Sequence, residues 1–341
     1  MSDSNKQWLL KTRPTGMVTV DNFEMVATPL PSPDFASGQV LIKNLMLGFD
    51  PAMRGWIEDV RSYLPPVAIG EPMRASGVGQ IIASENEDLP VGTLVQGLLD
   101  WQEYSIGDPA GPVPPRPLPD GTPPSMALSV FGTTTLTAYF GLLDIGQPQQ
   151  GDTVLVSGAA GATGSVVAQI AKLKGCRVIG IAGGKEKCQW LLDTCGLDEV
   201  IDYKSEDIDT RLGELCPDDI DVFFDNVGGD TLEVALDHMA DFSRIVLCGA
   251  ISQYNNETPA PGPKNLMILV ARRIRMQGFI VLDYLDRADE AFVELAAWVM
   301  DGKIAWREDT QEGFENIPAT LARLFDGRNQ GKQLLKLAEA D

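Results

Sequence analysis

The residues best suited to chemistry form a glycine-rich turn, AAGATG, at positions 159–164. An apolar run at 154–156 precedes the turn and predicts a buried parallel strand. Apolar residues that recur at helical spacing from Val166 to Leu173 predict a helix after it. A strand, a tight turn and a helix in this order favour phosphate binding, because the helix N-terminus offers free N–H groups and a positive dipole end to the anion.

Two glycines of this turn have separate expected roles. Gly161 would let the backbone approach a pyrophosphate, and Gly164 would let the helix pack closely on the strand. Ala159 stands where the usual fingerprint has its first glycine. A glycine-rich hexapeptide alone is a weak signal, but the strand expected at 177–182 completes a βαβ unit around it. The sequence therefore predicts a dinucleotide-binding site.

The end of this second strand indicates which dinucleotide binds. An acidic residue there would bind the ribose 2′-hydroxyl of NAD and repel a 2′-phosphate, whereas this chain has Gly183 and Gly184 followed by Lys185 and Lys187. Lysines are electrostatically unfavourable at a helix N-terminus, so their presence favours an anionic partner and NADP(H) as the cofactor. The alternative is that both lysines are simply solvated residues at the start of a helix.

Composition argues against several classes of function. A net charge of −21 over 341 residues disfavours nucleic acid and anionic membrane surfaces as partners, because basic patches bind both. No apolar run approaches the length of a membrane span, and the first residues lack a signal-peptide pattern, so we expect a cytoplasmic protein. The five cysteines are scattered and odd in number, which predicts reduced thiols and no disulfide.

The single histidine limits the available catalysts. A catalytic zinc site with one histidine between two cysteines, or a structural site with four closely spaced ligands, has no matching pattern here. His238 lies in a segment expected to be helical, and we expect it to be a packing or surface residue rather than a catalyst. We therefore expect neither a metal site nor a histidine-based triad.

The first part of the chain is typical of an all-β domain. Short strands broken by glycine and proline are expected up to about Asp108, for example at 39–44, 77–83 and 93–98. The proline-dense segment 109–124 predicts a connector between domains. A ligand for an SH3-type domain is the alternative interpretation, and the structured sequence on both sides disfavours it.

From Ser125 the pattern changes to helix and then to alternating strands and helices, which predicts a doubly wound parallel sheet. The later strands are expected at 200–203, 222–225, 244–248 and 276–282, with a helix at 286–300. The tail would add a strand from Ile304, a helix through Leu321 and Leu324, and a strand at 333–337 that returns to the first domain.

Several motifs along the chain resemble those of one family. They are DNVGG at 225–229, CGAISQYN at 248–255, GFIV at 278–281, EGFENIPA at 312–319 and GRNQGK at 327–332. In this order, and over nearly its whole length, the chain is similar to the zinc-independent medium-chain dehydrogenase/reductases. Within them it most resembles the group of prostaglandin reductases, alkenal double-bond reductases and curcumin-reductase-like NADP-dependent oxidoreductases.

The resemblance implies an α/β fold with two domains. A GroES-like, β-rich catalytic domain would comprise residues 1–125 and 304–341, and a Rossmann NADP-binding domain would comprise residues 126–303. The implied activity is NADPH-dependent reduction of the carbon–carbon double bond of α,β-unsaturated ketones or aldehydes.

The resemblance also implies the residues that contact the cofactor. The 2′-phosphate would contact Lys187 and Tyr203, and the ribose next to the nicotinamide would contact Asn226. The pyrophosphate would contact Gly161, Ala162, Thr163, Gly164 and Ser165. The nicotinamide end would be lined by Cys248, Gly249, Ala250, Ile251, Ser252, Phe279, Ile280, Val281 and, from the tail, Asn329.

Tyr254 is the expected catalytic residue. Hydride transfer to the β-carbon of an enone puts negative charge on the carbonyl oxygen, so catalysis chiefly requires a hydrogen-bond donor aimed at that oxygen. A phenol with a pKa of about 10 stays protonated at neutral pH and can donate, alone or with the ribose 2′-hydroxyl. The alternative is that Tyr254 only forms an aromatic wall of the pocket.

One departure from the family pattern concerns the substrate pocket. The family motif DPYMR is replaced by DPAMR at 50–54. In the double-bond reductases that tyrosine borders the pocket, so Ala52 is expected to leave a wider or differently shaped opening, which Trp56 or Tyr63 could fill. The physiological substrate is therefore open.

Two other functions fit the same sequence. One is an NADPH quinone reductase of the same superfamily, and the other is a protein that binds NADPH without catalysis. We expect a homodimer, because the last strand around Phe279 to Leu282 would leave a sheet edge able to pair with its symmetry mate.

Overall fold

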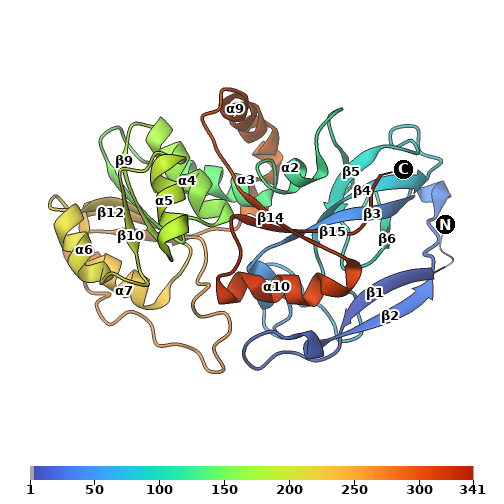
Figure 1. The fold of residues 1–341 in the computed structure, drawn as a ribbon, viewed down its shortest axis with the longest axis horizontal. Helices are drawn as coiled ribbons and strands as arrows, with labels where there is room; N and C mark the ends of the chain where they lie inside the picture. Colours follow the sequence, from blue (N-terminus) through green and yellow to red (C-terminus); the bar gives the residue numbers. More distant parts are fainter. Residues whose placement is uncertain (1–3, 341) are drawn as a thin grey trace. The chain divides into compact units, whose positions relative to one another are not determined.

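Two large sheets, built from different stretches of the chain, organise the protein in the computed structural model, which describes residues 4–340 (Figure 1). The chain divides into a first unit, Met1–Val130 with Glu308–Asp341, and a second unit, Phe131–Arg307. The first unit continues past residue 125 because α2 (Pro124–Leu128) packs its Ala127 and Leu128 side chains on the sheet of that unit.

The first unit is rich in β-structure. Its main sheet has the order β14-β15-β3-β4-β5-β7, with β6 also paired to β3, and a separate hairpin pairs β1 with β2. The strands are β1 (Ser4–Leu10), β2 (Phe23–Pro29), β3 (Val40–Phe49), β4 (Ser76–Ala83), β5 (Leu94–Leu98), β6 (Tyr104–Gly107), β7 (Arg116–Pro117), β14 (Glu308–Glu312) and β15 (Lys332–Lys336). The tail strand β15 runs antiparallel to β3, so the predicted return of the tail to the first domain is confirmed.

Two sequence predictions for this unit were wrong. The proline-dense segment is not simply a passage between domains, because Arg116–Pro117 forms β7 at the edge of the sheet, where a missing N–H is tolerated. The tail strand begins at Glu308 rather than Ile304. The reason is that the backbone of Ala305 is held within the second unit by the side-chain amide of Gln169.

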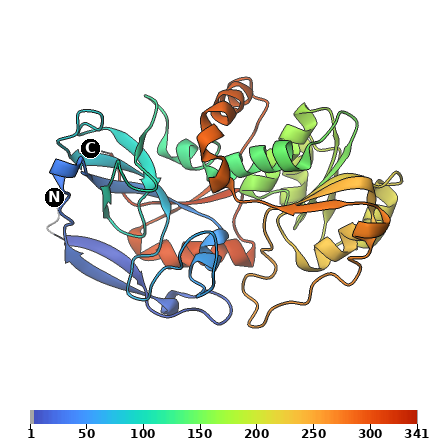
Figure 2. The same ribbon diagram turned by 180° about the vertical axis from the view of Figure 1, so that it is seen from behind.

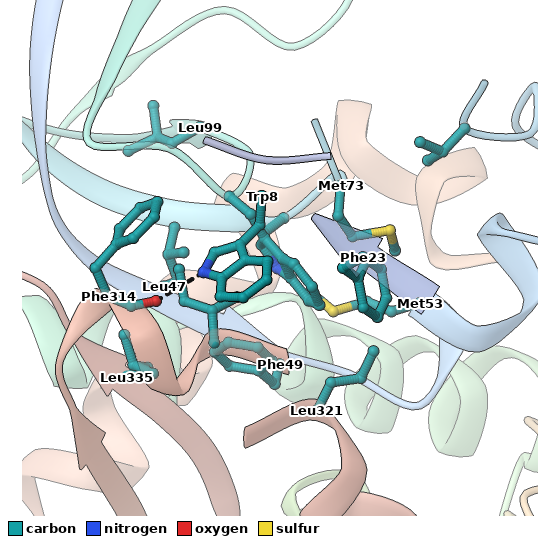
Figure 3. Packing of buried hydrophobic residues seen from close by; sticks show 14 of the residues in the cluster. Trp8, Phe23, Leu47, Phe49, Met53, Met73, Leu99, Phe314, Leu321 and Leu335 are labelled. Carbon is teal, nitrogen blue, oxygen red and sulfur yellow. Dashed lines mark hydrogen bonds between the residues drawn. The ribbon is translucent and has the colours of Figure 1, made fainter. Parts of the chain in front are cut away.

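Aromatic, leucine and methionine side chains pack together in the core of the first unit (Figure 3). The ring of Trp101 is fully buried, with its centroid 4.8 Å from that of Phe23 and 5.9 Å from that of Phe49. The indole N–H of Trp8 donates to the Phe314 carbonyl at 2.9 Å, which satisfies the polar edge of that ring. Burial of one such large side chain stabilises a fold by about 1.5–3 kcal/mol. This core supports α1 (Ala52–Trp56) and α10 (Ile317–Asp326).

The second unit contains a parallel sheet of six strands in the order β10-β9-β8-β11-β12-β13. Helices lie beside this sheet (Figure 2). The strands are β8 (Thr153–Ser157), β9 (Arg177–Ala182), β10 (Glu199–Asp202), β11 (Ile220–Asp225), β12 (Met239–Leu247) and β13 (Arg275–Gly278). The strand order reverses between β8 and β11, which confirms the predicted doubly wound sheet. Ligands of such sheets bind at the carboxyl ends of the strands beside this switch point.

The helices of the second unit alternate with these strands. They are α3 (Thr133–Phe140), α4 (Ala162–Leu173), α5 (Lys185–Asp193), α6 (Ile208–Leu215), α7 (Gly229–Asp237), α8 (Ile268–Ala271) and α9 (Ala288–Met300). None of the helices within residues 4–340 is long and apolar enough to cross a membrane.

The predicted ends of some elements in this unit were wrong. The helical stretch expected from Ser125 is broken before α3, and a π-helix (Gly141–Gly146) follows α3. The last strand ends at Gly278 instead of Leu282, and a 3₁₀ helix (Val281–Arg287) follows it. The chain leaves the sheet here because the Phe279 ring packs against Gly141. The contact is close, since a Cβ on Gly141 would lie 2.5 Å from an atom of that ring.

Candidate cofactor site and catalytic loop

The glycine-rich turn lies between the carboxyl end of β8 and the start of α4. Gly158 takes the left-handed conformation, with φ +58°, and its carbonyl accepts a hydrogen bond from the Gly161 N–H at 3.0 Å. Ala159 is fully buried, and its N–H donates to the Ile181 carbonyl on β9. An alanine is tolerated at 159 because the residue with positive φ is Gly158, one position earlier.

Close backbone approach explains the other glycines of the turn. A Cβ on Gly164 would lie 2.4 Å from the Gly158 carbonyl oxygen, and one on Gly161 would lie 3.2 Å from the same oxygen. Gly161 is the N-cap of α4, and no side chain caps the helix there. Its first N–H groups therefore point toward the turn without a side-chain acceptor, which fits the pyrophosphate of a dinucleotide.

At the carboxyl end of β9, packing explains Gly183 and the backbone conformation explains Gly184. A Cβ on Gly183 would lie 2.7 Å from the ring and hydroxyl of Tyr203, so a larger residue there would displace the tyrosine. Gly184 has φ +96°, and its N–H donates to the Asp202 carboxylate at 2.8 Å. That hydrogen bond is the main cause that lowers the pKa of Asp202.

Lys187 and Tyr203 come from neighbouring strand ends. Lys187 lies half-buried in the first turn of α5, which follows β9, and Tyr203 directly follows β10. The side chain of Tyr203 is 53% exposed, so its hydroxyl is accessible to a ligand. Asp202, beside Tyr203, was missed from the sequence, although its place at the end of an apolar strand was a usable signal.

The carboxyl end of β11 is tied to that of β8. The backbone N–H of Asn226 donates to the Ser157 hydroxyl at 2.8 Å, and its side-chain amide donates to the Ser157 carbonyl at 2.7 Å. Asp225 is fully buried, and its carboxylate accepts from the Ser157 hydroxyl and from two backbone N–H groups. Burial raises the pKa of Asp225. Sequence reasoning placed Asn226 in the site but missed both Ser157 and Asp225.

The loop after β12 is held by the turn after β11. The N–H groups of Cys248 and Gly249 donate to the Asp225 carbonyl at 2.9 and 3.2 Å, and that of Ile251 donates to the Asn226 carbonyl. The Ser252 side chain and N–H donate to a third carbonyl of the same turn. Burial raises the pKa of the Cys248 thiol to about 12, with Asp225 adding to the shift, so the thiol stays protonated.

Tyr254 folds back over its own loop. Its hydroxyl oxygen accepts a hydrogen bond from the Ala250 N–H at 3.1 Å. A Cβ on Gly249 would lie 2.8 Å from that hydroxyl, so the close contact requires glycine there. The loop therefore holds the phenol at a defined place relative to Cys248, Gly249 and Ala250.

Phe279, Ile280 and Val281, which were predicted to line the nicotinamide end, follow β13 directly. The Phe279 ring packs against Gly141 and lies 6.3 Å from the Tyr284 ring, so its side chain belongs to the packing of the second unit. Ile280 and Val281 are half-buried at the start of the 3₁₀ helix.

The predicted substrate-pocket residues lie in the first unit. Ala52 begins α1 and Trp56 ends it, and the Trp56 indole N–H donates to the Tyr63 hydroxyl at 2.7 Å. The Arg74 guanidinium lies 5.9 Å from the Trp56 ring centroid. Burial is the main cause that raises the pKa of Tyr63. Asn329, also in this unit, donates from its side chain to the Gly331 carbonyl.

Two further sequence predictions concern metal and histidine. Among the residues that the structure describes, no group of three or more His, Cys, Asp or Glu side chains could hold a metal ion. His238 is the C-cap residue of α7, and its Nε2 lies 2.7 Å from the exposed carboxylate of Asp209. This place fits the predicted packing or surface role.

A doubly wound parallel sheet with a glycine turn at its switch point, joined in one chain to a β-rich unit, defines a dinucleotide-dependent dehydrogenase or reductase. Comparison with known proteins gives the same class. Residues 6–114 match the family described as the N-terminal domain of oxidoreductase, and residues 162–299 match the zinc-binding dehydrogenase family.

Relatives extend over almost the whole chain. NADPH-dependent curcumin reductase of Escherichia coli (strain K12) is 40% identical, covering 99% of this chain and 98% of the relative. Prostaglandin reductase 1 of Rattus norvegicus is 41% identical, and the alignment covers 97% of this chain and 98% of the relative. The crystal structure of CurA in complex with NADPH from Vibrio vulnificus is 42% identical, with a TM-score of 0.91, covering 98% and 99%.

The chain therefore belongs to the zinc-independent medium-chain dehydrogenase/reductases, a family of NADP-dependent oxidoreductases, in the group of curcumin, prostaglandin and alkenal reductases. The family and the fold class predicted from the sequence motifs are confirmed.

Proposed function

We propose that the protein reduces the carbon–carbon double bond of α,β-unsaturated ketones and aldehydes with NADPH. The observation that carries this proposal is the loop after β12, which presents the Tyr254 hydroxyl on a backbone fixed by the turn at 225–228. The relatives named for curcumin, prostaglandins and 2-alkenals support the same substrate class.

Three parts of the second unit would hold the cofactor. Residues 161–165 would bind the pyrophosphate through the N-terminus of α4, because no side chain caps it. Lys187 and Tyr203 would bind the 2′-phosphate, and Asn226 would lie at the ribose beside the nicotinamide. When bound, NADPH supplies the hydride. The protein contributes binding, orientation and electrostatic stabilisation.

Tyr254 would stabilise the charge that develops on the substrate oxygen. Its hydroxyl oxygen accepts the Ala250 N–H, and this polarises the O–H bond, which makes the hydroxyl a stronger donor. A phenol with a pKa of about 10 keeps its proton at neutral pH. A donor aimed at a developing oxyanion commonly accelerates a reaction by about 100-fold or more.

NADPH oxidation against a panel of linear enals, cyclic and aryl enones, and quinones tests the function, with NADH as the control cofactor. Turnover of enals or enones with NADPH is the expected result. Turnover confined to quinones would replace the proposal with a quinone reductase. NADPH binding without oxidation of any acceptor would favour a non-catalytic binding protein.

The role of Tyr254 has its own test. Tyr254→Phe should lower kcat on the best enone by about 100-fold, because the donor is lost while the ring remains. The Kd for NADPH should stay within about twofold of the parent value. A Tyr254→Phe enzyme with unchanged turnover would leave the tyrosine only as a wall of the pocket.

A further inference from the structure

The carboxylate of Asp225 is fully buried at the carboxyl end of β11 and takes no part in the proposed chemistry. Its Oδ1 accepts from the Ser157 hydroxyl at 2.7 Å and from the N–H groups of Val227 and Gly228 at 3.0 Å. Its Oδ2 accepts from the Gly228 N–H at 3.1 Å. A buried charge is costly unless it is satisfied in this way, and hydrogen bonds to a charged acceptor are strong. The carboxylate therefore holds the turn at 225–228 in one geometry.

That turn carries the loop expected at the nicotinamide end. The backbone carbonyl of Asp225 accepts from the N–H groups of Cys248 and Gly249, and the next carbonyl, of Asn226, accepts from Ile251. Two residues further along this loop comes Gln253, followed by Tyr254, whose hydroxyl contacts the same segment. A shift of the turn would thus move the loop and the tyrosine together.

Ser157 connects the same network to the phosphate turn. It is the last residue of β8, it is fully buried, and Gly158 begins the glycine turn directly after it. Its hydroxyl donates to Asp225 and accepts from the Asn226 N–H, while its carbonyl accepts from the Asn226 side chain. The ends of β8 and β11 are therefore fixed to each other by side chains as well as by the sheet.

We propose that Asp225 is a positioning residue, which sets the place of Asn226 and of the loop at 248–254 relative to the glycine turn without touching either reactant. This inference rests on the proposed function. A carboxylate suits the position because it only accepts, and the groups that face it are a hydroxyl and two backbone N–H donors. Asparagine keeps one accepting oxygen, whereas alanine keeps none.

The same pair of strands offers a matched control. The Asp221 carboxylate, also on β11, accepts from the Thr153 N–H of β8 at 2.8 Å, at the opposite end of both strands. Asp221→Asn therefore weakens a comparable link between β8 and β11, far along the strands from the turn. It should leave catalysis unchanged.

The experiment compares Asp225→Ala, Asp225→Asn and Asp221→Asn in the full chain. Three quantities are measured: kcat with the best enone, the fluorescence of bound NADPH, and the Kd for adenosine 2′,5′-bisphosphate, which carries the 2′-phosphate but no nicotinamide. A misplacement of about 1 Å at reacting groups can cost about 100-fold in rate. We expect Asp225→Ala to lower kcat by about 100-fold and Asp225→Asn by about 10-fold. Both should change the NADPH fluorescence and leave bisphosphate affinity intact.

Several results would overturn the inference. They are unchanged kcat and fluorescence in a folded Asp225→Ala protein, an equal loss in Asp221→Asn, or a parallel loss of bisphosphate affinity, which indicates general destabilisation. If Asp225→Ala does not fold, Ser157→Ala removes one hydrogen bond to the carboxylate and the one from the Asn226 N–H, and should lower kcat by a smaller factor. If the parent protein reduces no enone, the proposed function fails, and the fluorescence and bisphosphate measurements decide the role of Asp225 alone.

Discussion

Substituting alanine for Gly164 and, in a second variant, for Gly161 should show which glycine of the turn is needed for packing and which for cofactor binding. A Cβ at 164 would lie 2.4 Å from the Gly158 carbonyl oxygen, whereas ordinary contact begins near 3.4 Å, so the start of α4 must move by about 1 Å. Overpacking of a close-packed interior costs about 1–3 kcal/mol. For a domain of this size, about 2 kcal/mol lowers the melting temperature by about 4–8 °C.

Gly161→Ala provides the contrast. Its Cβ would lie 3.2 Å from the same oxygen, which requires a shift of only about 0.2 Å, and the φ of −77° suits alanine. The melting temperature should therefore change by about 1 °C or less. The methyl group would instead stand where the pyrophosphate is expected, and the Kd for NADPH should rise by about 10-fold, or about 1.4 kcal/mol.

Calorimetry measures both quantities, by thermal scans of the ligand-free proteins and by titration with NADPH. Gly262→Ala is the control, because a Cβ there would meet nothing within 4 Å. If Gly164→Ala melts with the parent protein, or if Gly161→Ala is destabilised to the same extent, the close approach of α4 to the turn does not explain these glycines.

Three further predictions concern cofactor, substrate and assembly. Lys187→Ala should raise the KM for NADPH by about 10-fold and leave that for NADH unchanged, because one charge to the 2′-phosphate is lost; equal effects on both cofactors would contradict this. Ala52→Tyr should change the ranking of enone substrates in the NADPH oxidation panel, and an unaltered ranking would place residue 52 outside the pocket. A homodimer is expected through the last strand; because that strand ends at Gly278, the pairing edge would be β13, one of the two edges of the sheet, and a monomer mass by light scattering would refute it. The expected cytoplasmic location stays a prediction that cell fractionation tests.

Local patterns predicted the middle of the parallel sheet well, because its central strands β8, β9 and β11 are short, mostly apolar runs that are largely buried. These patterns failed where a contact between residues far apart in the sequence determines the path of the backbone. The apolar run from Phe279 is typical of a strand, yet the chain bends because the Phe279 ring packs against Gly141, which no local pattern shows. The proline-rich segment was misinterpreted for a related reason, since its short strand exists only through pairing with β5.

The candidate site was predictable where glycine or a motif marked it, and not where a carboxylate is buried. Charged residues are rarely fully buried, so a strand that ends in Asp225 is normally expected to expose that side chain. Burial is favourable here because the carboxylate accepts from two backbone N–H groups of its own turn and from the Ser157 hydroxyl, which lies 68 positions away in the sequence on β8. Such a convergence depends on the register of β8 against β11, which the sequence does not state.

Cofactor choice depends on packing as well as on charge. In the sequence, the lysines and the absence of an acidic residue at the end of β9 indicate NADP(H). The structure adds a steric reason, because the ring and hydroxyl of Tyr203 leave no room for a Cβ on Gly183. An aspartate at 183, which would favour NAD by binding its ribose, would therefore also displace the tyrosine expected at the 2′-phosphate. A single substitution at 183 should therefore act at both positions, and both effects would disfavour NADP(H).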